Sequence, residues 1–127
     1  MSRKILIMAV VLILLSGLCA VEQVLTRRIT DAALANTQEI MADIRVSQLH
    51  TAKQKAHALD EAWDGEAKRL ELMVDHSSTD EVRYALSRLL AALESGDRAG
   101  ALIYAGALEG ALEHVMERQA LTPENIL

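Results

Sequence analysis

One histidine stands among acidic residues in this 127-residue sequence, and its surroundings suit cation binding or proton chemistry best. His76 directly follows Asp75 and lies four residues before Asp80. An imidazole beside two carboxylates can bind a cation or change its charge near neutral pH. In a structural interpretation, His76 instead ends a helix, where an imidazolium faces the negative end of the helix dipole. A single histidine is a weak metal signal, so the structural interpretation is preferred, and the three residues are kept as candidates.

The other reactive side chains form no recognisable site. His50 and His57 are seven residues apart, whereas zinc-binding histidine pairs on helices are four apart, and His114 stands alone. Cys19 lies in an apolar run, so it has no partner for nucleophilic chemistry. We therefore predict no catalytic residue, no metal site and no cofactor, and we expect the protein not to be an enzyme.

An uncharged stretch of seventeen residues, Ile5 to Val21, determines where these residues are held. As a helix it is roughly 26 Å long, close to the hydrocarbon thickness of a bilayer. Arg3 and Lys4 precede it and favour a cytoplasmic N-terminus. A cleaved signal peptide and lipidation of Cys19 stay open as alternatives, although the bulky Leu18 suits neither. The apolar side chains assigned to the anchor are Ile5, Leu6, Val10, Leu14, Leu18 and Val21.

This pattern predicts a single-pass protein of the cell membrane. Residues 1–25 form the anchor, and residues 26–127 form an extracytoplasmic domain. Removing the first 21 residues, which include Arg3 and Lys4 but no acid, from a chain of net charge −5 leaves a net charge of −7. Nucleic acid is excluded as a partner, because phosphates require a basic surface.

Apolar residues spaced by three and four predict an all-α fold, with the transmembrane helix followed by two helical hairpins. The hairpins are expected at about 29–75 and 78–120, with a tail at 121–127. Thr30, Thr51 and Ser78 are predicted helix caps, although a first helix continuous with the anchor stays open. Gly96 is expected to end one helix and Asp97 to cap the next. The predicted core consists of Leu59, Trp63, Leu70, Leu86, Leu89, Leu93, Leu108 and Leu112.

Two further sets of residues have a predicted place in the fold. Gly100, Gly106 and Gly110 are expected to let another helix approach closely. Tyr84 and Tyr104 fall off the apolar stripes and are expected at the surface, where partner contact and ordinary exposure are equally good interpretations.

The two hairpins are related by an internal repeat. A shift of 49 residues places Thr30-Asp31 on Thr79-Asp80, Ile40 on Leu89, and Leu59 on Leu108. Hairpins of this kind resemble tetratricopeptide-like units, which need neighbours to bury their apolar faces. Two units are fewer than an open array requires, so we expect a four-helix bundle that either closes on itself or leaves a groove for a partner.

Four features together resemble a family of short bacterial proteins: Trp63, the pair Asp75-His76, the run Leu86 to Leu89, and the ending Thr122 to Leu127. The family is catalogued as a domain of unknown function, and its members have one N-terminal membrane segment. The resemblance covers nearly the whole chain and implies an anchored helical domain with no assigned activity. Ser78 departs from the family pattern, which often has an acid there, and this weakens any role for a histidine–acid pair.

The leading hypothesis is an interaction module that docks onto another membrane or envelope protein through its Leu/Ala faces and acidic surface. A polytopic membrane protein is a candidate partner, and a homo-oligomer stays open. The alternative is an extracytoplasmic sensor that binds a small ligand or a cation near His76. The tail residues Asn125, Ile126 and Leu127 are expected to dock onto the bundle, because large apolar residues gain by burial.

Overall fold

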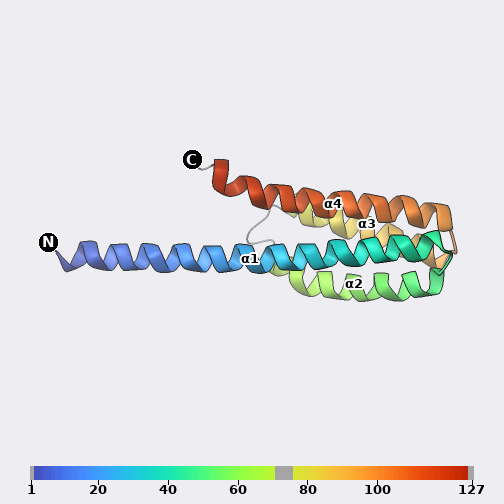
Figure 1. Ribbon diagram of the computed structural model, residues 1–127, viewed down its shortest axis with the longest axis horizontal. Coiled ribbons are helices and arrows are strands. Elements are labelled where there is room, and N and C mark those ends of the chain that lie inside the picture. The colour runs from blue at the N-terminus through green and yellow to red at the C-terminus, as the bar shows by residue number, and fades with distance from the viewer. Residues whose placement is uncertain (1, 71–75, 126–127) are drawn as a thin grey trace.

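The computed structural model describes residues 2–70 and 76–125, with side chains described for 2–68 and 77–118. These residues form four α-helices and no β-strand (Figure 1): α1 Arg3–Arg45, α2 Leu49–Leu70, α3 His76–Glu94 and α4 Arg98–Asn125. Consecutive helices run in opposite directions. Helix α1 packs against α2 and α4, and α3 packs against the same two helices. The all-α prediction is confirmed, and the helices close into a ring.

Helix α1 is 43 residues long and carries both the apolar stretch and the first helix of the bundle. Its N-terminal part is long and apolar enough to cross a membrane and is not buried against the rest of the chain, although a signal sequence would share these properties. The cap predicted at Thr30 is wrong, because Thr30 lies inside α1 and is buried. The helix therefore runs from the apolar stretch into the bundle without a break.

The buried face of α1 is partly polar. Its residues are spaced alternately by four and three, as in a coiled coil: Thr26, Thr30, Ala33, Thr37, Ile40 and Ile44. Each threonine hydroxyl donates to the carbonyl four residues earlier, at 2.7, 3.0 and 2.8 Å in chain order. Because these hydroxyls are satisfied within α1, they enter the core without leaving an unpaired donor.

Aliphatic side chains from all four helices fill the core. The buried residues include Leu59, Trp63, Leu86, Leu89, Leu93, Leu108 and Leu112, whereas the side chain of Leu70 lies outside the described set. Trp63 is 2% exposed, and its indole N–H has no hydrogen-bond partner among the described residues. It borders an enclosed void with Leu59 and Leu112 that leaves no space for a water molecule. Packing of the ring therefore compensates for an unsatisfied donor.

The two loops at the far end of the bundle are copies of each other. Ser47 in the α1–α2 loop has a φ of 62°, and Gly96, 49 residues later, has a φ of 71°. The amide of Gln48 donates to Asp43 O at 2.8 Å, and its counterpart Asp97 donates to Ala92 O at 2.9 Å. The amides of residues 46, 47 and 52 each donate to a backbone carbonyl, and the amides of residues 95, 96 and 101 donate to the carbonyls 49 residues further along. The internal repeat is therefore present in the backbone as well as in the sequence.

Capping at this end matches the sequence only in part. The Asp97 carboxylate accepts a hydrogen bond from the Gly100 amide at 3.0 Å and caps α4, as predicted. A Cβ on Gly100 would collide with that carboxylate, which explains this glycine. The predicted caps Thr51 and Ser78 are wrong, because α2 and α3 each begin two residues earlier.

The expectation for the remaining glycines of α4 is also wrong. A Cβ placed on Gly106 or Gly110 would meet no atom within 4 Å, so no helix approaches closely there.

Arg98 joins the two hairpins at the same end. Its Nε–H donates to Ile44 O at 3.0 Å and its Nη2–H donates to Arg45 O at 2.7 Å. These bonds supply donors to carbonyls at the C-terminus of α1, where the Ile44 carbonyl also accepts from the Ser47 amide at 3.0 Å. They also fix the register of α4 against α1, with Arg98 level with Ile44.

Candidate functional site

The histidine set proposed from the sequence is only partly described. Asp75 lies outside the described residues, and His76 is the first residue of α3. The interpretation of His76 as the end of the preceding helix is therefore wrong, because the start of a helix is the positive end of its dipole. Asp80 is exposed on the first turns of α3. No group of three or more metal-ligating side chains occurs in the described part of the chain.

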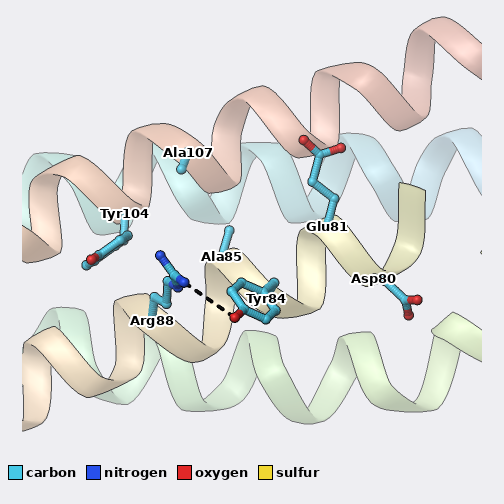
Figure 2. A pocket seen from close by; sticks show the side chains of 7 residues that line it. All are labelled: Asp80, Glu81, Tyr84, Ala85, Arg88, Tyr104 and Ala107. Carbon is cyan, nitrogen blue, oxygen red and sulfur yellow. Dashed lines mark hydrogen bonds between the residues drawn. The ribbon is translucent and has the colours of Figure 1, made fainter. Parts of the chain in front are cut away.

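A groove between α3 and α4 is a stronger candidate. It has a volume of about 410 Å³. Its lining residues are Asp80, Glu81, Tyr84, Ala85, Arg88, Tyr104 and Ala107. Figure 2 shows Arg88 between the rings of Tyr84 and Tyr104, with Asp80 further along α3. The groove thus brings one of the three histidine-set candidates together with both surface tyrosines.

Contacts with aromatic rings hold Arg88 in place. Its guanidinium carbon lies 4.6 Å from the centroid of the Tyr84 ring and 5.9 Å from that of Tyr104. Its Nη2–H also donates to the Tyr84 hydroxyl at 3.4 Å, and this bond is the main cause of a raised pKa of Arg88. The guanidinium is thus a fixed, permanently charged group with N–H donors left for a partner.

The helix pattern explains why these side chains face outward. Val82, Leu86 and Leu89 turn inward from α3 and are buried. Asp80, Tyr84 and Arg88 follow one another at intervals of four and form an exposed ridge on another face of the same helix. Tyr84 is 64% exposed although it is a large aromatic residue. Tyrosine and arginine are the residue types enriched at protein–protein contacts.

The equivalent place in the first hairpin carries different side chains. The 49-residue shift places Ala35 where the second hairpin has Tyr84, Glu39 where it has Arg88, and Lys55 where it has Tyr104. There the Lys55 ammonium lies 3.9 Å from the Glu39 carboxylate and 2.8 Å from that of Asp43. The hydrogen bond to Asp43 is the main cause of a raised pKa of Lys55. An ion-pair cluster therefore stands where the second hairpin has two tyrosines and Arg88.

Glu81, which lines the groove from α3, contacts His114 of α4. The Glu81 carboxylate lies 3.5 Å from Nδ1 of His114, so the two helices share a contact at this edge. Asp80 has no hydrogen-bond or ion-pair partner among the described residues. Arg88 forms no ion pair with a carboxylate in the same part of the chain. The groove thus presents an unpaired carboxylate and a guanidinium that contacts only tyrosines among the described residues, with Tyr84 between them.

A family model for a domain of unknown function, DUF4363, matches residues 22–126. The chain belongs to this family. The match begins at Glu22, directly after the apolar stretch, so it covers the helices of the bundle and not that stretch. No curated protein and no solved structure matches the chain.

The DUF4363 bundle uses its Leu/Ala faces internally. Leu86 and Leu89, which were predicted as core, and Ala105, which was predicted to face inward, are buried between helices. The exposed groove was not predicted as a site, because Tyr104 lies on a different helix from Tyr84 and Arg88. The repeat offers one signal, since these are three of the positions at which the two hairpins differ in side-chain class. The tail residues Ile126 and Leu127 lie outside the described residues, and only the backbone of Asn125 is described.

Proposed function

We propose that this DUF4363 protein is a membrane-anchored interaction module that docks onto another membrane or envelope protein through the groove between α3 and α4. Ile5 to Val21 spans the cell membrane once, with Arg3 and Lys4 on the cytoplasmic side, and the bundle lies outside the cytoplasm. The observation that carries the proposal is the exposed cluster of Tyr84, Arg88 and Tyr104. No such cluster exists on the equivalent face of the first hairpin.

The continuous α1 helix supports this function because it sets the height of the groove. By the repeat, Asp80 is level with Asp31 and Arg88 is level with Glu39. At 1.5 Å per residue these positions lie roughly 15 and 27 Å above Val21, for a helix perpendicular to the bilayer. The partner must therefore extend at least that far from the membrane. Anchoring also raises the local concentration of both proteins, so a small contact surface can suffice.

Site-specific photocrosslinking in native membranes tests the proposal. A photoreactive amino acid replaces Tyr84 in one full-length variant and Ala35 in the other. The two positions are exposed, lie at the same height and are equivalent in the repeat. We expect one discrete protein adduct from position 84 and none from position 35. Equal adduct patterns from both positions, or no adduct from either, would contradict docking through this groove.

A further inference from the structure

We propose that the groove accepts a helix of a different protein, which places a basic side chain beside Asp80 and an acidic side chain beside Arg88. This inference rests on the proposed docking function and specifies the chemistry of the partner. Asp80 and Arg88 are eight residues apart on the ridge, which is roughly 12 Å along α3. A helix lying along the ridge matches both charges when its own two charges are about two turns apart.

The two charges of the ridge are available to a partner. Asp80 has no hydrogen-bond or ion-pair partner among the described residues. Arg88 contacts only tyrosine rings and a tyrosine hydroxyl within the same part of the chain. Because Tyr84 and Tyr104 hold the guanidinium in place, little side-chain freedom remains to be lost on binding. Opposite charges at the two ends of a groove select both the partner and its orientation.

A second copy of this chain cannot supply that match within one membrane. Copies anchored in the same bilayer have parallel α3 helices, since α1 continues into the bundle without a break. A parallel pair related by a two-fold axis would place Asp80 opposite the second copy's Asp80 and Arg88 opposite the second copy's Arg88. Like charges repel at both ends, so the complementary helix belongs to another protein.

Synthetic helical peptides test the charge requirement on the full chain in nanodiscs. Three probes share a Leu/Ala face and differ only at two exposed positions eight residues apart, which carry Lys and Glu, Glu and Glu, or Lys and Lys. Fluorescence anisotropy gives the Kd of each. We expect the Lys/Glu probe to bind about three- to tenfold more tightly than the others, as for two exposed ion pairs. Equal binding of the three probes, or binding by none, would overturn the inference.

Charge exchange provides the specificity control. Asp80→Lys should transfer the preference to the Glu/Glu probe, and adding Arg88→Asp should restore the preference for the Lys/Glu probe. Glu61→Lys on the exposed surface of α2 makes the same change in net charge and should leave the preference unchanged. If Glu61→Lys shifts it equally, net charge and not the groove selects the probe, and the inference fails.

Disulfide trapping tests the exclusion of a second copy. In a Cys19→Ser background, Tyr84→Cys should form linked dimers in membranes no faster than Glu61→Cys. Rapid dimerisation through position 84 would overturn the inference. If photocrosslinks from position 84 persist while the probes show no charge preference, docking through the groove is supported and only the proposed charge pattern of the partner is refuted. If position 84 also gives no adduct, the proposed function falls with it.

Discussion

The equivalent loops α1–α2 and α3–α4 predict that exchanging the residue types at Ser47 and Gly96 changes stability in opposite directions. Ser47 has a left-handed backbone, which costs a residue with a Cβ roughly 1–2 kcal/mol. Glycine removes that cost but gains freedom in the unfolded chain worth about 0.4–1 kcal/mol. Ser47→Gly should therefore stabilise the bundle by about 0.5–1 kcal/mol. Gly96→Ser should destabilise it by a similar amount, because a Cβ there meets no atom within 4 Å and gains no packing.

The assay is urea unfolding of the full chain in detergent micelles, followed by the fluorescence of Trp63. This residue is the only tryptophan and is buried in the bundle, so its signal reports bundle unfolding and not the anchor. The double variant Ser47→Gly with Gly96→Ser should return to within about 0.5 kcal/mol of the wild type. If the two single substitutions change stability in the same direction, the loops are not equivalent and the reasoning from the repeat is wrong.

Three other outcomes are expected. Arg98→Ala should lower the free energy of unfolding by about 1–2 kcal/mol in the same assay, because the Arg45 carbonyl loses the arginine donor and the Ile44 carbonyl keeps only the Ser47 amide; no change would show that water replaces the arginine. The pKa of Glu94 is lowered, mainly by its hydrogen bond with Lys53. The ionised carboxylate therefore stabilises the fold above about pH 4.3, the pKa in the unfolded chain, and this stabilisation is lost as the pH falls through the lower pKa of the folded state. Thermal unfolding of Glu94→Gln should accordingly depend less on pH in the acid range than that of the wild type, and parallel curves would contradict this. A spin label at position 121 should lie at the lipid–water boundary by power-saturation depth measurements. Arg98 is level with Ile44, so position 121 of α4 is level with Val21, the end of the apolar stretch. A label in bulk water would refute that register.

The fold was largely readable from the sequence because apolar side chains recur at helical spacing. The inward stripes of α2, α3 and α4 consist of aliphatic residues together with Trp63, and the structure buries them. The inward stripe of α1 was predictable only in part, since Thr26, Thr30 and Thr37 occupy core positions that apolar periodicity does not detect. Their hydroxyls are satisfied by the preceding turn of the helix, and that local compensation leaves no signal in a hydropathy pattern.

Helix starts were predicted less well than helix faces. Serine and threonine near a helix start suggest a cap, but at Thr51 and Ser78 the helix begins two residues earlier. The candidate site was harder still. A groove requires residues from two helices at one height, and only the packing of α3 on α4 brings Tyr104 to Arg88. Comparing the two hairpins position by position is the procedure that reveals it from sequence.

The most direct test of the central claim replaces the groove with its counterpart from the first hairpin. The triple variant Tyr84→Ala, Arg88→Glu and Tyr104→Lys exchanges ring contacts for an exposed ion pair, so its stability should stay within about 1 kcal/mol of the wild type. With a photocrosslinker at Ile103, which is 69% exposed on α4, the wild type should yield the partner adduct in native membranes and the folded triple variant should not. An undiminished adduct from the folded variant would contradict docking through this groove.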